Sequence, residues 1–295
     1  MNITQNQKDR AKKFQEMHRQ DKLFVLPNIW DAGGAKIFEK KGFQALATTS
    51  AGIAFANGFA DGGELPFSIL LETVRRITSK IDIPLSIDFE RGYSEDIQEI
   101  YENTKKILLS GAVGLNVEDG LPKKRISNLQ VMKNKIECIN SLKKELGVDF
   151  VINSRTDIYW NEIGDPESRL PAAIKRVNSY FSWGADCVFV PGNISFNELK
   201  TLTNEVNGPL NILLNKDLQN INQLDTLGVR RISLGSSLSR NSISNLFEEV
   251  EKIGKNNFDS LLNNTLSYES VNQLYEGKSE PNKNCYQHCS GDKSR

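Results

Sequence analysis

The strongest constraint on the fold of this chain is a pattern that repeats eight times. In each repeat a short β-branched or apolar run ends in polar residues, and a stretch with helical spacing follows it. Alternating strands and helices predict parallel strands joined by right-handed crossovers. Eight such units could form an open, doubly wound sheet, but eight is also the number of strands that closes a barrel. We therefore predict an α/β fold of the (β/α)8 TIM-barrel type, with strands in the runs Leu23–Ile29, Ala45–Ser50, Pro84–Glu90, Gly114–Asp119, Phe150–Asp157, Cys187–Gly192, Leu210–Asn215 and Arg230–Gly235.

The length of the chain predicts one barrel with terminal extensions. Its 295 residues exceed the roughly 250 that such a barrel takes, so we expect a single domain over residues 1–275. An amphipathic helix is expected before the first strand, and Ser239–Ile253 and Phe258–Tyr275 also have helical spacing. The polar tail, residues 276–295, is predicted to be disordered. It contains Cys285, His288 and Cys289, which could bind a metal but are more simply part of a floppy end.

Composition excludes several classes of partner. Basic and acidic residues are equal at 37 each, whereas a nucleic-acid or anionic-membrane surface would favour an excess of positive charge. No apolar run approaches the roughly 20 residues that cross a bilayer, and the polar N-terminus does not resemble a signal peptide. The 4 cysteines are scattered, which disfavours a disulfide framework. We therefore expect a cytoplasmic protein with a small-molecule substrate.

Carboxylates gather where the predicted strands end, which is the catalytic face of this fold. Residues two apart on a strand share a face, so Asp88 and Glu90 are both expected to point at the barrel axis, where Glu118 can join them. Clustered carboxylates need a cation or protons, and a cluster of oxygens alone suits Mg²⁺, with Mn²⁺ as the alternative. The competing interpretation is a set of solvated helix caps, and Asp119 fits either interpretation equally well.

Arg155 and Asn153 are predicted to share one face of the fifth strand. An arginine at the mouth of an acidic site can bind a substrate carboxylate or phosphonate through two hydrogen bonds. The alternative is a structural ion pair with Asp157 or Glu118. Asp31, which follows the first strand, is equally well explained as the cap of the next helix.

Small residues end the second strand. Ser50, Ala51 and Gly52 offer backbone N–H groups that suit an anion or an enolate oxygen. The glycine-rich segment that follows, residues 57–63, suits a mobile loop.

These residues resemble the isocitrate lyase / phosphoenolpyruvate mutase superfamily. The similar stretches run in order from Phe24 to Gly235 and read LPNIWDAGGAKIFEKKGFQALATTSAGIAFANGFADG (26–62), SIDFERGYSED (86–96), GAVGLNVEDG (111–120), VINSRTD (151–157), GADCVFVPG (184–192) and GVRRISLG (228–235). One such match would be weak, but six in sequence identify the chain as a member of the superfamily.

The resemblance implies a barrel whose last helix is commonly swapped onto a neighbour in a dimer of dimers, hence a homotetramer. It also implies one Mg²⁺, bound directly by Asp88, with Asp61, Glu90 and Glu118 acting mainly through its waters. The backbone around Ser50 and Ala51 would hold the oxo-carboxylate of the substrate, and Arg155 its anionic group. The shared intermediate is a pyruvate-type enolate stabilised by the metal.

One loop departs from the best-known members. The isocitrate and methylisocitrate lyases carry a Cys-Gly-His sequence after the fourth strand, and its cysteine is the catalytic acid. Here residues 121–128 read LPKKRISN, with neither Cys nor His. Lys123 in this loop is a candidate for binding the substrate. The closest branch is then the phosphonomutase and oxaloacetate-decarboxylase-like one.

The sequence therefore predicts a Mg²⁺-dependent lyase or decarboxylase that acts on a small 2-oxo or 2-hydroxy dicarboxylic acid. Two alternatives stay open. One is P–C bond chemistry on phosphonopyruvate, as a mutase or a hydrolase. The other is a non-catalytic barrel, which the trio Asp88, Glu90 and Glu118 argues against.

Overall fold

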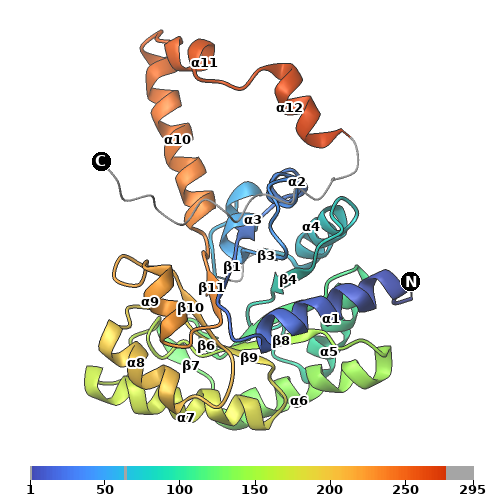
Figure 1. Ribbon diagram of the computed structural model, residues 1–295, viewed down its shortest axis with the longest axis vertical. Helices are drawn as coiled ribbons and strands as arrows, with labels where there is room; N and C mark the ends of the chain where they lie inside the picture. Colours follow the sequence, from blue (N-terminus) through green and yellow to red (C-terminus); the bar gives the residue numbers. More distant parts are fainter. Residues whose placement is uncertain (1, 63–64, 277–295) are drawn as a thin grey trace, which may run out of the picture.

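The parallel sheet closes into a barrel through one proline-interrupted strand (Figure 1). The computed structural model describes residues 2–62 and 65–276. The two ends of its sheet, β1 and β2, are the halves of a single predicted run, separated at Pro27, which has no N–H for the ladder. The order is β1-β11-β10-β9-β8-β5-β4-β3-β2, so the predicted eight-stranded barrel is confirmed. The strands are β1 (Phe24–Leu26), β2 (Asn28–Ile29), β3 (Leu46–Thr48), β4 (Leu85–Asp88), β5 (Gly114–Glu118), β8 (Val151–Arg155), β9 (Cys187–Val190), β10 (Leu210–Leu213) and β11 (Arg231–Ser233).

Helices surround this barrel and bury their apolar faces against it. Val74 and Ile77 of α4 and Ile107 of α5 are fully buried, as the spacing of apolar residues on these helices predicts. The surrounding helices are α2 (Ala32–Lys40), α3 (Ser50–Ala56), α4 (Phe67–Thr78), α5 (Ile97–Leu109), α6 (Leu129–Leu146), α7 (Pro166–Ser182), α8 (Phe196–Glu205) and α9 (Ile221–Thr226).

The predicted N-terminal helix, α1 (Gln5–Arg19), closes the amino end of the barrel. The amide nitrogen of Gln7 donates to the carbonyls of Leu108 and Ala112 at 2.6 and 2.9 Å, just before β5 begins. Phe14 lies fully buried against Gly114, the first residue of β5. Because this end is closed by apolar packing, the carboxyl end of the strands is the face left for a substrate.

A short hairpin follows β5 and was not predicted. It pairs β6 (Gly120–Leu121) with β7 (Arg125–Ile126). Lys123 and Lys124 at its tip have φ values of 61° and 52°, the left-handed conformation that a tight hairpin turn requires. Two-residue strands are too short to produce a periodic pattern, which is why the sequence did not reveal them.

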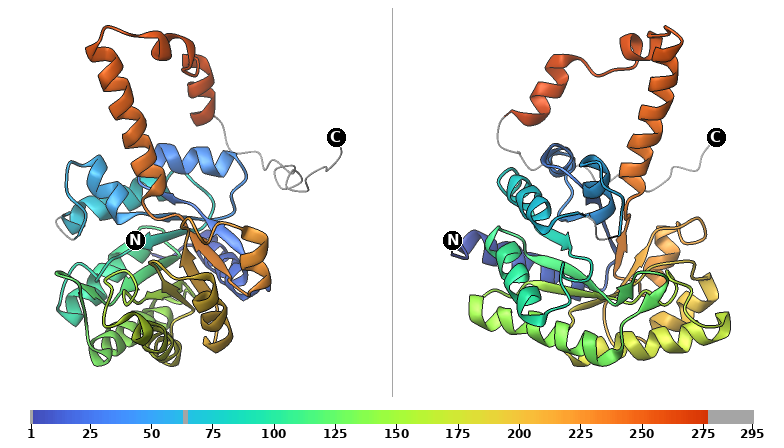
Figure 2. Two further views of the ribbon diagram at one scale, coloured as in Figure 1. Left: turned by 90° about the vertical axis from the view of Figure 1, so that its left-hand side faces the viewer. Right: turned by 180° about the vertical axis from the view of Figure 1, so that it is seen from behind.

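The chain leaves the barrel after β11 as a C-terminal arm, residues 237–276. Figures 1 and 2 show α10 (Ser237–Gly254) projecting away from the barrel, α11 (Asp259–Asn263) at its far end, and α12 (Tyr268–Tyr275) returning beside α2. The ammonium group of Lys40 on α2 donates to the carbonyls of Gln273 and Glu276 at 2.5 and 2.9 Å. The expected single helical stretch over Phe258–Tyr275 is thus two helices, because Ser267 starts a new one by accepting from the N–H of Ser270.

Many apolar side chains of the C-terminal arm are exposed to solvent. Leu246 and Phe247 on α10 are 63% and 68% exposed, and Leu262 beyond them is 79% exposed. An apolar surface of this kind marks an interaction site. Across the described residues, no helix combines the length and the apolar character that crossing a membrane requires. Cys138 and Cys187 are free thiols, while Cys285, His288 and Cys289 lie outside the described residues, as do residues 277–295 of the predicted tail.

Candidate active site

Asp88, the last residue of β4, lies at the carboxyl end of the barrel with its two oxygens in different surroundings. Its Oδ2 accepts hydrogen bonds from the backbone N–H of Ser50 at 3.0 Å and from the Ser50 hydroxyl at 2.8 Å. Its backbone N–H donates to Thr48 Oγ1 at 2.8 Å, which fixes the end of the strand. Its Oδ1 is buried and has no hydrogen-bond partner among the described residues. A buried carboxylate oxygen without a donor is costly, and it is the group that a cation would satisfy.

Glu90 reaches the same site by a route that strand alternation did not predict. The strand ends at Asp88, and Glu90 has a φ of 49°, so the argument that placed both carboxylates on one strand face is wrong. A turn brings Glu90 back instead: its backbone carbonyl accepts from the N–H of Glu118 at 2.9 Å, and its carboxylate accepts from the Tyr93 hydroxyl at 2.9 Å. Phe89 between them points outward and is fully buried near Phe67.

Arg155, at the end of β8, lies between two carboxylates. Its Nη1 is 3.2 Å from Glu118, and its Nε donates to Asp157 at 2.5 Å. The rings of Trp160 and Phe189 lie near the guanidinium, each with its centroid 5.7 Å from the central carbon. Arg155 therefore forms ion pairs with both Glu118 and Asp157, the alternative that the sequence left open beside substrate binding. A guanidinium has five donors, so this pairing still leaves N–H groups for a substrate.

Three acids at the mouth of the barrel have raised pKa values. Burial, and then the charge of Asp88, raises the pKa of Glu90 to about 7. Burial also raises the pKa of Glu118, although Arg155 opposes the shift. Partial burial, and then the charge of Asp88, raise the pKa of Asp61, which lies in the loop after α3. Together, Asp61, Asp88, Glu90 and Glu118 form what we call the mouth cluster, a group of acids that favours either protons or a bound cation.

The mouth cluster is not a closed metal cage. Among residues 2–62 and 65–276, no three His, Cys, Asp or Glu side chains are grouped closely enough to enclose an ion. Mg²⁺ commonly keeps several waters and takes only one or two carboxylates directly. The arrangement, one free oxygen of Asp88 surrounded by more distant acids, fits that preference.

Metal binding should therefore depend on pH. The pKa of Glu90 is higher in the folded protein than in the unfolded chain. Its contribution to the free energy of unfolding is therefore fully present below the pKa of the unfolded chain and is lost as the pH rises through about 7. Mg²⁺ would offset the charge that appears. We expect the rise in melting temperature on exchanging EDTA for Mg²⁺ to be several degrees larger at pH 8 than at pH 5.5. Thermal unfolding in the two buffers measures this, and equal stabilisation at both pH values would contradict it.

The other residues predicted to bind substrate lie in three different settings. Ser50 gives both of its donors to Asp88, and Ala51 is buried beside it at the start of α3. A Cβ on Gly52 would lie 2.5 Å from Thr49 and 3.1 Å from Trp30, so close packing already accounts for this glycine. Asn153 is fully buried beneath Arg155. Lys123 is exposed at the tip of the β6–β7 hairpin.

Two acids that the sequence left undecided are structural. Asp31 caps α2 by accepting from the N–H of Gly34 at 2.6 Å. Asp119 is 1% exposed and accepts from Arg176, Tyr180 and Thr156 at 2.7, 2.6 and 2.8 Å. It ties α7 to the start of the hairpin and is not part of the mouth cluster.

Sequence reasoning gave no role to Tyr93 and considered Asp157 only as an ion-pair partner. No signal indicates that Tyr93 would donate to Glu90, because that contact depends on the left-handed turn at Glu90. Asp157 ends a predicted strand two residues after Arg155, and that spacing was the available signal.

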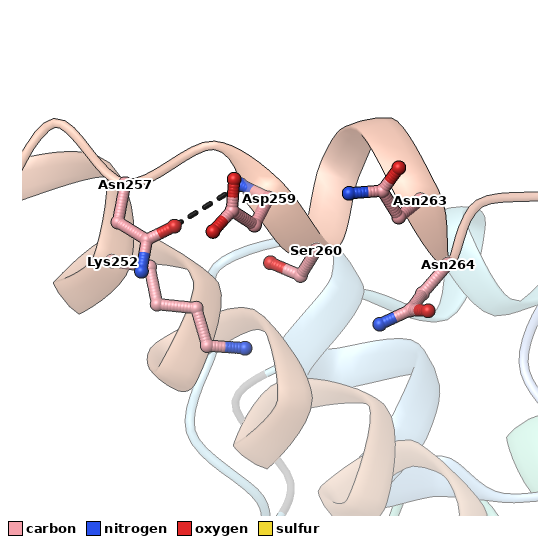
Figure 3. Close-up of a pocket in the computed structure, with 6 residues that line it drawn as sticks. All are labelled: Lys252, Asn257, Asp259, Ser260, Asn263 and Asn264. Atoms are coloured by element: carbon pink, nitrogen blue, oxygen red, sulfur yellow. Dashed lines mark hydrogen bonds between the residues drawn. The ribbon is translucent and has the colours of Figure 1, made fainter.

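A separate polar pocket, drawn in Figure 3, lies where α10 ends and α11 begins, which Figure 1 shows at the far end of the C-terminal arm. The side chains that line it are Lys252, Asn257, Asp259, Ser260, Asn263 and Asn264. It contains one acid, Asp259, and lacks the grouped carboxylates of the mouth cluster. The barrel mouth is therefore the candidate active site.

Comparison with known proteins gives a family match, related sequences and a similar solved structure. The sequence model of the family described as phosphoenolpyruvate phosphomutase matches residues 14–254. An uncharacterized protein of Mycobacterium tuberculosis is 32% identical over 76% of this chain and 81% of its own. The 2-methylisocitrate lyase of Halalkalibacterium halodurans is 25% identical over 70% of this chain and 67% of its own. The crystal structure of a Burkholderia cenocepacia protein named as a lyase/mutase superposes with a TM-score of 0.87, at 26% identity over 94% of this chain and all of that one.

Proposed function

The chain belongs to the phosphoenolpyruvate phosphomutase family, and on that premise we propose that it is a Mg²⁺-dependent lyase or decarboxylase of a small 2-oxo or 2-hydroxy dicarboxylic acid. The observation that carries the proposal is the state of Asp88. Ser50 fixes one of its oxygens, while the other is buried and has no hydrogen-bond partner in the part of the chain that the structure describes.

The residues present fit Mg²⁺, and Mn²⁺ is the alternative ion. Asp88 would hold the ion through its free oxygen, and Asp61, Glu90 and Glu118 would hold its waters. When bound, the ion would supply positive charge that offsets the negative charge developing on the oxo group as the neighbouring bond breaks.

The residues of the chain would orient the substrate. Arg155 is held between Glu118 and Asp157, and its remaining N–H groups would bind a carboxylate of the substrate. Lys123 on the hairpin would attract the distal anionic group. The absence of Cys and His from residues 121–128 favours a reaction whose carbanion equivalent is protonated by water or a weak acid. Decarboxylation meets that condition.

The test is pyruvate release from a panel of oxaloacetate, methylisocitrate, dimethylmalate and phosphonopyruvate, each with Mg²⁺ and with EDTA. Oxaloacetate loses CO₂ slowly with Mg²⁺ alone, so an Asp88→Ala protein is the blank. We expect EDTA-sensitive turnover of a dicarboxylate above that blank. Pyruvate release from phosphonopyruvate alone would instead assign hydrolysis of its P–C bond, and conversion of phosphonopyruvate to phosphoenolpyruvate would assign a mutase. No turnover across the panel, together with no Mg²⁺ binding, would favour a non-catalytic barrel.

We also propose that the C-terminal arm docks on a second copy of the chain, within a homo-oligomer built as a dimer of dimers. Its exposed Leu246 and Phe247 support this proposal. Replacing both with aspartate should lower the molar mass in solution at least twofold, because charges would then have to be buried in the interface. Light scattering coupled to gel filtration measures the mass, and Glu248→Gln on the same helix is the control. A wild-type protein that is already monomeric would refute this.

A further inference from the structure

A second polar layer lies directly beneath the mouth cluster. Ser86, Asn116 and Asn153 precede Asp88, Glu118 and Arg155 by two positions on their strands, so each shares a face with the residue above it. All three are buried, at 1%, 4% and 0% exposure. Apolar, branched side chains normally fill this part of a barrel. The polar layer therefore needs an explanation other than packing.

Arg231, the first residue of β11, is 0% exposed and extends into this layer. Its Nη2 donates across the barrel to Asn116 Oδ1 at 3.5 Å, and the same oxygen accepts from Asn153 Nδ2 at 2.6 Å. Its Nε and Nη1 have no hydrogen-bond partner in the described part of the chain. Burial lowers the pKa of Arg231 to about 10, so it stays charged at neutral pH.

Among residues 2–62 and 65–276, one group of opposite charge interacts with Arg231. His18 below it has a pKa lowered to about 3 by burial, and is neutral. Burial raises the pKa of Cys187 beside it to about 12, so this thiol is neutral too. The remaining charged group that interacts with Arg231 is Asp88 in the layer above. A buried, poorly paired cation is costly to the fold, and an apolar side chain would fill the space at lower cost.

We propose that Arg231 is a positioning residue that acts through Asp88 and the polar layer. Its positive charge beneath the mouth cluster lowers the repulsion that an anionic substrate meets beside four carboxylates. The same charge repels Mg²⁺, so Arg231 weakens the binding of the metal while it strengthens the binding of the substrate. This inference rests on the proposed function, because it requires a metal and an anionic substrate at Asp88.

The test separates the two affinities. Arg231→Met and Arg231→Gln remove the charge, and Arg231→Lys retains it. Calorimetric titration with Mg²⁺ alone should show binding on the order of tenfold tighter in the two neutral variants, with the lysine variant within about twofold of wild type. Titration with oxalate, a planar dianion, in saturating Mg²⁺ should show binding about tenfold weaker in the neutral variants. Far-UV circular dichroism checks that each variant is folded.

Opposite shifts in the two affinities are the signature of a charge effect, because a residue with a purely structural role would weaken both. Weaker Mg²⁺ binding in both neutral variants, or unchanged affinities, would overturn the assignment of Arg231. Failure of the wild-type protein to bind Mg²⁺ would instead overturn the proposed function itself. The two failures are therefore distinguishable.

Discussion

Replacing Asp88 with alanine should lower kcat/KM for the substrate identified in the panel by about a thousandfold or more. The reason is that the two oxygens of this carboxylate have different roles. One oxygen is held by two hydrogen bonds from Ser50, and the buried free oxygen is the direct ligand we propose for Mg²⁺. Steady-state kinetics at saturating Mg²⁺ measures the loss, and excess metal should not restore the rate.

Graded variants make this prediction specific. Ser50→Ala removes the hydroxyl donor but keeps the backbone N–H, so we expect a smaller loss, about tenfold. Glu90→Gln should fall between the two, since Glu90 is proposed to act through water. An Asp88→Ala protein within tenfold of wild type would show that the reaction does not depend on this carboxylate.

Replacing Asp119 with alanine should destabilise the fold by about 3–5 kcal/mol, the typical result of removing one partner of a buried ion pair. The change leaves Arg176 and Tyr180 buried without the carboxylate oxygen on which both converge. It also frees the N–H of Asp157, which donates to Asp119 at 2.8 Å. Urea unfolding monitored by circular dichroism measures the free energy of unfolding.

Asp149→Ala is the matched control. Asp149 is exposed just before β8, so its loss should change the free energy of unfolding by less than about 0.5 kcal/mol. If Asp119→Ala were as mild as this control, the network around Asp119 would not stabilise the fold. A large loss of Mg²⁺ affinity with an unchanged free energy of unfolding would instead assign Asp119 to the mouth cluster.

The barrel was predictable because its signal is repeated along the chain. Each predicted run contains an observed strand, since burial on both faces selects continuous apolar residues. The β6–β7 hairpin and the break between α11 and α12 were not predictable in the same way. Both depend on single turns, at Lys123 and Lys124 and at Ser267, and single turns leave no periodicity.

The candidate site was predictable as residue types but only partly as geometry. Asp88 and Glu118 lie at the carboxyl ends of neighbouring strands, where the sequence placed the acids, although both strands end earlier than predicted. Glu90 reaches the cluster through a left-handed turn, which no pattern of alternation could indicate. The sequence left Asp119 open between a site residue and a helix cap, and its side chain instead meets Arg176 of α7. The burial of Arg231 could not be predicted, because a hydropathy pattern does not show that a charged side chain in a strand is buried.

The most direct test of the central claim is a calorimetric titration of the wild-type and Asp88→Ala proteins with Mg²⁺ at pH 8, without substrate. We expect the wild-type protein to bind one Mg²⁺ per chain with millimolar or tighter affinity, and the variant to show no binding. Equal binding by the two proteins would place the metal elsewhere. No binding by either at millimolar Mg²⁺ would contradict a metal-dependent active site at the mouth of this barrel.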